Sequence, residues 1–268
     1  MPPFQILKPE GERLPVLLNI PHCGTAFPDE LMPHFKAHLA GRPDDTDWFV
    51  HTLYDFAPAM GITVLHAVYH RWVIDLNRPP DNQPLYHDGR LITGLCPVTT
   101  FTGEPLYRDE RPAVADNEIQ HRLQHYYNPY HRQLQHLLQE LKARFGTVLL
   151  WDCHSIRHYV PTIHPEPFPA LILGDAGGTS ASPGLIETAL KSLEQSGLAV
   201  SHNHPFSGGH ITRWYGRPAE NQHALQLEMS KLVYMDDTEE RYHPQRAGKI
   251  RQVLRTTLLR LAECLVKQ

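Results

Sequence analysis

The chain is predicted to form an α/β fold: a single domain, residues 1–268, in which a mixed, mostly parallel sheet is flanked by helices. Short apolar runs alternate with segments whose apolar residues recur at helical spacing, which is typical of this class. Neither an internal repeat nor a linker or change of composition divides the chain. At 268 residues one large domain can bury a substantial core.

The first half of the chain is predicted to hold a strand at 14–20, a helix at 47–60 and a strand at 62–68. The first strand stops at Pro21, and the helix ends at Gly61. The apolar, β-branched run that follows Arg71 predicts a further strand, which ends at Pro79. Residues 81–114 are rich in Pro, Gly and Thr, and so long an irregular excursion is more often functional than idle.

In the second half, apolar residues at steps of three and four predict a helix over 116–145, with Pro129 as a kink or break and Gly146 as its end. The other predicted elements are strands at 147–151, 170–173 and 198–201 and a helix at 250–265. Residues 203–216 contain two adjacent glycines and are predicted to form a flexible loop that enters a short strand. Residues 223–229 alternate apolar and polar, and both a strand and a helix remain open there.

Composition excludes several classes of protein. The formal charge is −4 without a basic block, so neither nucleic acid nor an acidic membrane surface is an expected partner. No apolar run is long enough to span a membrane, and the amino terminus lacks the pattern of a secretory signal. The four cysteines are scattered, which favours reduced thiols and a cytoplasmic location over disulfides or a thiolate zinc site.

His22 and His154 each follow a run of aliphatic residues within two or three positions. Ligands bind beyond the carboxyl ends of strands in open α/β sheets, so these two imidazoles can converge on one metal. A carboxylate from Asp44-Asp45-Thr46-Asp47 can complete a set of two histidines and one carboxylate, which leaves one zinc position for water. The alternative is that Asp45 or Asp47 caps a helix and both histidines are ordinary loop residues.

Arginine and carboxylate side chains suggest the rest of a site. Asn77 and Arg78 are predicted to stand where the chain turns, and a guanidinium can hold a carboxylate with two parallel hydrogen bonds. Arg213 is a second candidate for an anionic substrate, although packing against Trp214 is its ordinary alternative. If 223–229 is a strand, Gln226 and Glu228 share a face, and Glu228 can act as a general base; on a helix it would be a solvated carboxylate.

Other chemistries lack their signatures. Ser155 lies beside His154, but no Gly-x-Ser-x-Gly elbow is present, which argues against a serine hydrolase. The run 174–178 is glycine-rich but has neither the lysine nor the spacing of a phosphate-binding or dinucleotide-binding loop.

Taken together, these segments resemble the N-formylglutamate amidohydrolase (N-formylglutamate deformylase) family. The matching pieces occur in family order over roughly residues 14 to 237. They are Ile20-Pro21-His22-Cys23-Gly24-Thr25, Asp45-Thr46-Asp47-Trp48, Arg71-Trp72-Val73-Ile74-Asp75-Leu76-Asn77-Arg78, Thr93-Gly94-Leu95-Cys96-Pro97, Pro129-Tyr130-His131, Leu150-Trp151-Asp152-Cys153-His154-Ser155-Ile156-Arg157, Gly208-Gly209-His210-Ile211-Thr212-Arg213 and His223-Ala224-Leu225-Gln226-Leu227-Glu228.

The resemblance implies a fold similar to zinc carboxypeptidases and aspartoacylases, one divalent metal ion, expected to be zinc, and hydrolysis of N-formyl-L-glutamate to formate and L-glutamate. It implies that His22 and His154 bind the metal and that Glu228 is the general base. Asn77 and Arg78 would then hold the substrate carboxylate, while Arg71 polarises the scissile carbonyl. Arg213 is the candidate for the second carboxylate of this small-molecule substrate.

The chain departs from the family pattern at Cys23 and at His70-Arg71-Trp72, and neither change removes a proposed ligand. Thr25 stands where zinc carboxypeptidases carry a metal-binding glutamate, so the metal carboxylate must come from elsewhere, and Asp45 is favoured over Asp47. The nearest rival function is hydrolysis of another N-acyl amino acid, such as N-formylaspartate or N-acetylglutamate. A non-catalytic, histidine-rich metal-binding protein would carry clustered histidines instead. Oligomeric state is not predicted.

Overall fold

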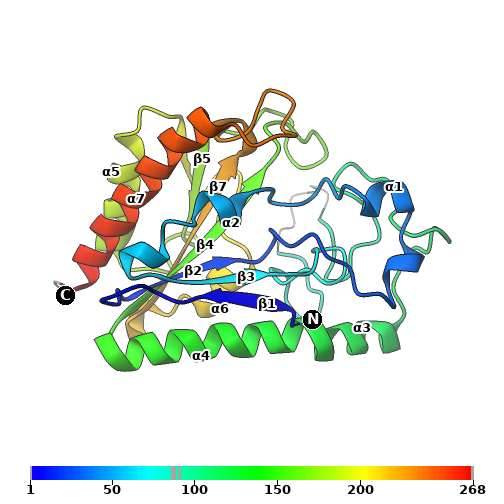
Figure 1. The fold of residues 1–268 in the computed structure, drawn as a ribbon, viewed down its shortest axis with the longest axis horizontal. Helices are drawn as coiled ribbons and strands as arrows, with labels where there is room; N and C mark the ends of the chain where they lie inside the picture. The colour runs from blue at the N-terminus through cyan, green and yellow to red at the C-terminus, as the bar shows by residue number, and fades with distance from the viewer. Residues whose placement is uncertain (1, 86–88, 90–91, 267–268) are drawn as a thin grey trace.

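The computed structural model describes residues 2–85, 89 and 92–266, and within them one seven-stranded sheet runs through the molecule (Figure 1). Its strands are β1 (Phe4–Leu7), β2 (Val16–Ile20), β3 (Thr63–Ala67), β4 (Val148–Ile156), β5 (Leu171–Gly174), β6 (Val200–His202) and β7 (Gln222–Ser230), in the order β1-β3-β2-β4-β7-β5-β6. Strands β3, β2, β4 and β7 are parallel, and β6 is parallel to β5. The antiparallel pairs are β1–β3 and β5–β7, and the other four neighbouring pairs are parallel, so the predicted mixed, mostly parallel sheet is confirmed.

Helices cover both faces of this sheet (Figure 1). They are α1 (Ala37–Ala40), α2 (Val50–Leu53), α3 (Asp116–Arg122), a π segment (Leu123–Tyr127), α4 (Asn128–Phe145), α5 (Pro183–Glu194), α6 (His210–Tyr215) and α7 (Pro244–Val266), with short 3-10 turns at Met32–His34, Pro58–Met60, Pro218–Glu220 and Lys231–Val233. Among the described residues, no helix has the length and apolar character needed to cross a membrane.

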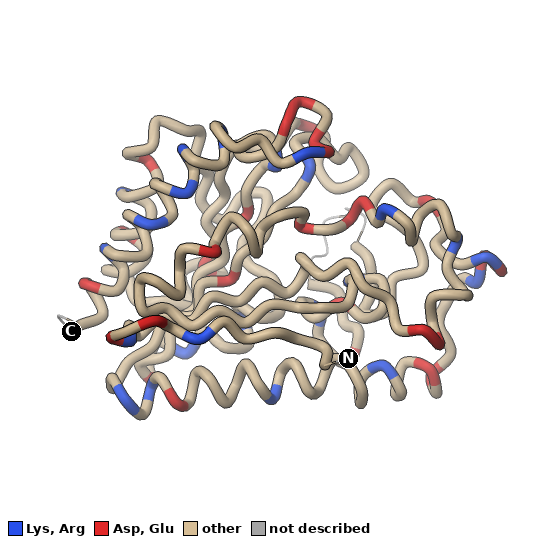
Figure 2. The backbone as a smooth tube through the Cα atoms, in the orientation of Figure 1, with Lys and Arg blue, Asp and Glu red and all other residues tan. Residues whose placement is uncertain are grey.

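Alternation along the strands creates two cores. Leu18 and Trp151 pack with Leu254 of α7 and with α2 and α5 on one face. Leu17 and Leu150 point to the other face and pack with α4 and α6. Both faces of the central strands are therefore apolar, which explains why β2 and the start of β4 read as continuous apolar runs. Along the chain, the positions of basic and acidic residues are interspersed (Figure 2).

Three predicted elements are wrong. Most of 47–60 is irregular, because Phe49 adopts a left-handed φ of 62° and the helix that follows, α2, has only four residues. The segment 71–78 consists of turns rather than a strand, since buried polar side chains such as Asp75 bond its own backbone. The run 210–215 is helix α6, whose first residue follows Gly209. Helix α5 was not anticipated.

The predicted helix over 116–145 is present as α3, the π segment and α4, and it ends at Gly146, whose φ is 77°. Pro129 lies just after the π segment. A proline has no N–H, and its ring clashes with the carbonyl four residues earlier, here that of His125. The helix accommodates Pro129 by widening over the preceding turn instead of breaking.

Candidate metal centre and active site

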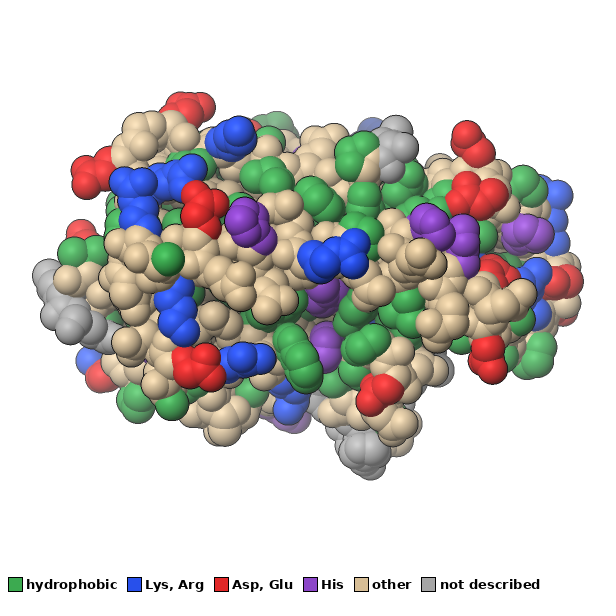
Figure 3. All heavy atoms as spheres, turned by 90° about the horizontal axis from the view of Figure 1, so that it is seen from below, with side chains coloured by type: hydrophobic (Ala, Val, Ile, Leu, Met, Phe, Trp, Pro, Cys, Tyr) green, Lys and Arg blue, Asp and Glu red, His purple; other side chains and the backbone are tan. Residues whose placement is uncertain are grey.

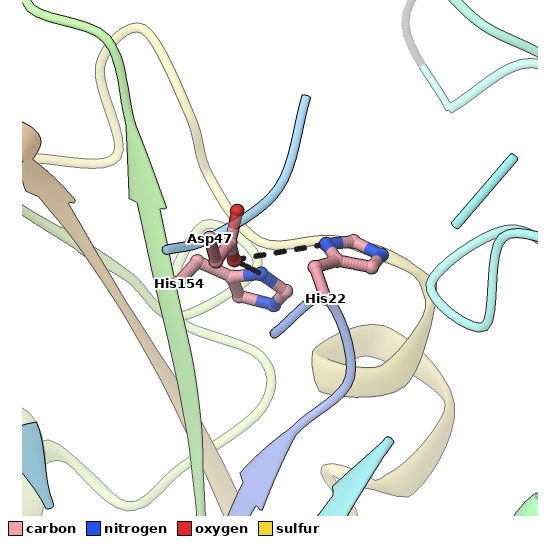
Figure 4. A group of neighbouring side chains, drawn as sticks. All are labelled: His22, Asp47 and His154. Carbon is pink, nitrogen blue, oxygen red and sulfur yellow. Dashed lines mark hydrogen bonds and ion pairs between the residues drawn. The ribbon is translucent and has the colours of Figure 1, made fainter. Parts of the chain in front are cut away.

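Three buried side chains from distant parts of the chain meet at the carboxyl ends of β2 and β4 (Figure 4). His22 follows β2 by two residues, His154 lies within β4, and Asp47 precedes α2. The Oδ2 atom of Asp47 lies 3.2 Å from Nδ1 of His154 and 3.9 Å from Nδ1 of His22. One possible ligand atom from each of the three side chains lies within 4.8 Å of the other two. Among the described residues, no other group of three or more His, Cys, Asp or Glu side chains meets this criterion.

The remaining nitrogen of each imidazole faces a second carboxylate. Nε2 of His22 lies 2.8 Å from Oδ1 of Asp75, and Nε2 of His154 lies 3.2 Å from Oδ2 of Asp152. Both aspartates are fully buried. For His22, a carboxylate behind the ring favours the proton on Nε2 and leaves Nδ1 toward Asp47, as is usual for metal-binding histidines. Nε2 of His154 also lies 3.0 Å from the side-chain amide nitrogen of Asn77.

Asp75 and Asp152 were not singled out from the sequence, although a signal exists for Asp152. It precedes His154 by two residues on the same strand, and residues two apart on a strand share a face. Asp152 is fixed in turn by the side-chain amide of Asn19, which donates to its Oδ1 at 2.7 Å.

The donor set fits a divalent cation such as zinc. Two imidazole nitrogens and one carboxylate oxygen are ligands that zinc prefers, and three protein ligands leave a position open for water or substrate. Burial, aided by the charge of Arg71, lowers the pKa of His22 to about 4, so this ring is neutral. Burial opposes protonation of His154 too, but Asp152 and Asp47 outweigh it and raise its pKa well above the ordinary value. A cation that binds here must displace that proton.

The structure reverses the preference for Asp45 over Asp47. The carboxylate of Asp45 accepts hydrogen bonds from Nε1 of Trp72 at 2.9 Å and from the backbone N–H of Phe101 at 3.1 Å, and it is not part of the histidine group. Asp47 is held beside the histidines because its backbone N–H donates to the carbonyl of His22 at 2.9 Å.

A cavity of about 90 Å³ opens directly over this group. Its polar lining consists of His22, Asp47, Arg71, Asn77, Arg78, His154, Ser155, Gln226 and Glu228. Apolar side chains, among them Phe101, Ile156 and Phe206, form the rest of the wall. Cationic, carboxylate and imidazole groups therefore converge on one small space with partly apolar walls, which is the usual composition of a binding site for a small polar molecule.

Glu228 comes from β7, directly beside His154 in the parallel register of β4 and β7. The strand alternative for 223–229 is thus confirmed, and Gln226 and Glu228 both face the cavity. Among the described residues no hydrogen bond to the Glu228 carboxylate is found. Burial, reinforced by the charge of Asp47, raises the pKa of Glu228 to about 8, against the opposing charges of His154 and Arg71.

Although the segment 71–78 is not a strand, its Arg71, Asn77 and Arg78 line the cavity. Arg71 donates to Oδ2 of Asp75 at 2.5 Å, and its guanidinium lies 4.7 Å from the ring centroid of Phe101. The side-chain carbonyl of Asn77 accepts from the backbone N–H of Ile211 at 2.8 Å. Nε of Arg78 donates to the carbonyl of Thr93 at 2.8 Å. These bonds fix two guanidiniums and one amide at the cavity wall.

Arg213 lies elsewhere. Its side chain is exposed and folds back onto the preceding loop, where it donates to the carbonyl of Gly208 at 2.9 Å and to the hydroxyl of Ser207 at 2.8 Å. It does not line the cavity. The geometry therefore gives no support to the predicted contact between Arg213 and a substrate carboxylate.

Residues 14–235 match the family model described as N-formylglutamate amidohydrolase. The chain belongs to the N-formylglutamate amidohydrolase family. It is 42% identical over 229 residues to an N-formylglutamate deformylase from Pseudomonas putida, which covers 85% of this chain and 84% of the relative. It is also 42% identical over 238 residues to an N-formylglutamate deformylase from Pseudomonas aeruginosa, which covers 87% and 86%.

Solved structures agree with this family assignment. The crystal structure of N-formylglutamate amidohydrolase from Ralstonia eutropha JMP134 superposes with a TM-score of 0.83 at 28% identity, and covers 100% of this chain and 99% of that one. The gene product Atu2144 from Agrobacterium tumefaciens superposes with a TM-score of 0.71 at 17% identity, over 96% and 95%, and shares the fold.

Proposed function

We propose that this member of the N-formylglutamate amidohydrolase family hydrolyses N-formyl-L-glutamate to formate and L-glutamate with one divalent cation, zinc, held by His22, Asp47 and His154. One observation carries the proposal: the histidine–aspartate group, the Glu228 carboxylate and two guanidiniums face the same cavity. As the family resemblance implies, we place the reaction at the end of a histidine degradation route in the cytoplasm.

The substrate is a formamide with two carboxylates, so its site needs fixed cations. Arg78 and the amide of Asn77 hold one carboxylate, because both line the cavity and both are anchored by bonds to neighbouring backbone. Fixing that end of the substrate brings the formyl carbon over the cation site and makes attack effectively intramolecular.

Zinc, when bound, acts as a Lewis acid toward the formyl carbonyl and makes water at the site more acidic. Glu228 accepts a proton from the attacking water, and its raised pKa suits a group that must later give the proton back. As the C–N bond breaks, Glu228 donates that proton to the departing glutamate nitrogen. Arg71 is placed to stabilise the negative charge that develops on the formyl oxygen.

The decisive experiment measures formate release and bound metal on the same purified protein. We expect formate from N-formyl-L-glutamate with close to one zinc per chain, loss of turnover with a chelator, and its return on adding zinc. N-formyl-L-aspartate and N-acetyl-L-glutamate serve as matched substrates. Faster turnover of either would favour the rival N-acyl amino acid hydrolase, and full activity in metal-free protein would contradict the cation's role.

A further inference from the structure

Three side chains of the long helix bind the backbone of the segment that carries Asn77 and Arg78. Arg122 donates to the carbonyl of Val73 at 2.8 Å. Nε2 of His131 lies 2.9 Å from the carbonyl of Leu76, and the hydroxyl of Tyr127 donates to the carbonyl of Arg78 at 2.8 Å. Carbonyl oxygens only accept, so the hydrogen of His131 is on Nε2.

These three residues share one face of the helix because of the π segment. Arg122 and Tyr127 are five positions apart, and in a regular α-helix residues four apart are the ones that align. A π turn holds about one residue more than an α turn, so Leu123–Tyr127 returns Tyr127 to the face of Arg122. His131 follows Tyr127 by four positions and lies on the same face.

His131 and Tyr127 are themselves held in place by neighbouring side chains. The ring of His131 stacks on that of Tyr127 with centroids 4.1 Å apart. Nδ1 of His131 lies 3.0 Å from the hydroxyl of Tyr215 in α6. Tyr127 is 4% exposed and Arg122 is fully buried. His121 and His125, which precede Tyr127 in the chain, are exposed. Several histidine side chains lie at the surface of the molecule seen from below (Figure 3).

We propose that Tyr127 and His131 are positioning residues that set the location of Arg78 and Asn77, and so the affinity for the substrate carboxylate. The inference rests on the proposed function, since it takes Arg78 as the carboxylate contact. Neither side chain lines the cavity, so they act only through the backbone of residues 76–78. The segment consists of turns and depends on such side-chain bonds to its carbonyls, which a strand would satisfy through the sheet.

Tyr127→Phe removes the bond to the Arg78 carbonyl and keeps the ring that packs on His131. We expect the KM for N-formyl-L-glutamate to rise about threefold to tenfold, the effect of one lost hydrogen bond, with kcat within about twofold and zinc content unchanged. Tyr126→Phe is the matched control. The Tyr126 hydroxyl bonds Glu30, and neither residue lines the cavity. The KM of the Tyr126→Phe variant should therefore match that of the unsubstituted enzyme.

A double-mutant cycle with Arg78→Ala separates positioning from general destabilisation. If Tyr127 acts through Arg78, Tyr127→Phe should add little to the KM increase caused by Arg78→Ala. Fully additive effects, or a normal KM in Tyr127→Phe, would overturn the inference and leave the proposed function intact. Failure of the unsubstituted, zinc-loaded enzyme to release formate would contradict the proposed function itself.

Discussion

The carboxylates of Glu228 and Asp45 differ in the hydrogen bonds that they accept. Asp45 is buried and saturated by bonds from Trp72 and Phe101, whereas Glu228 has no such bond among the described residues and faces the cavity. Burial raises the pKa of both. Of these two carboxylates, only that of Glu228 lines the cavity and stays available for proton transfer there.

Glu228→Gln keeps the shape of the side chain and removes the base. We expect kcat to fall about 10²–10⁴-fold, the usual contribution of a positioned general base, while bound zinc stays the same. Formate release and metal analysis on one sample measure both. Glu263→Gln, an exposed substitution on α7, is the control and should leave kcat unchanged. Near-normal turnover of Glu228→Gln would remove Glu228 from the mechanism.

The pKa of Glu228 predicts how turnover depends on pH. A general base works deprotonated, so turnover should rise with pH through the pKa of Glu228 and then level off. Burial sets this pKa at about 8 without a cation, and a cation beside Asp47 acts in the opposite direction, so the midpoint is expected below 8. The rise should be missing from the residual activity of Glu228→Gln.

The choice between Asp45 and Asp47 could not be made from the sequence. The two residues lie two positions apart in an irregular segment, where no periodicity says which side chain faces the sheet. The deciding bond, from the Asp47 N–H to the His22 carbonyl, joins residues far apart in the chain. The expected substrate contact of Arg213 gains no support for a related reason, because 210–215 is a helix rather than a strand and Arg213 on it is exposed.

At the scale of elements, the predictions succeeded where periodicity or strand ends carried the information. The alternation of β7 correctly placed Gln226 and Glu228 on one face, and the aliphatic runs of β2 and β4 led to His22 and His154. The strand predicted at 71–78 is wrong because apolar residues there are buried in turns that pack against helices. Side chains such as Arg122, rather than a neighbouring strand, bond its backbone.

The start of α6 depends on the absence of a side chain at Gly209. A Cβ there would lie 2.3 Å from Nδ2 of Asn77, whose amide is buried and bonded to Ile211. We expect Gly209→Ala to displace Asn77 and raise the KM for N-formyl-L-glutamate at least about tenfold, because an amide hydrogen bond to a charged carboxylate is worth roughly 1.5–3 kcal/mol.

Gly248→Ala is the matched control, since it lies within α7 and a Cβ there meets nothing within 4 Å. Its KM should be unchanged and its stability raised by roughly 0.5–1 kcal/mol, the helix preference of alanine over glycine. Steady-state kinetics and thermal unfolding of both variants test the pair. An unaltered KM in Gly209→Ala would mean that Asn77 does not contact the substrate.

At the scale of the whole molecule, the sheet order explains why residues far apart in the chain form one site. Strands β2, β4 and β7 are adjacent and parallel, so their carboxyl ends deliver His22, His154 and Glu228 to the same edge. Alternating strands and helices predicted this class of fold, but not the strand order, which depends on long-range pairing. That residues 1–268 form a single domain stays a prediction.

A cation bound at this edge would tie together β2, β4 and the segment before α2, so metal binding should stabilise the whole fold. We expect zinc at about 100 times its Kd to add roughly 2.7 kcal/mol, or about 5–10 °C in Tm for a chain of this size. Asp47→Asn should abolish most of that shift. Asp45→Asn should unfold at a lower temperature, having weakened the bonds to Trp72 and Phe101, yet keep the zinc-dependent shift. Thermal unfolding of both variants with zinc and with chelator separates the two aspartates, and a shift that survives in Asp47→Asn but not in Asp45→Asn would restore Asp45 as the ligand.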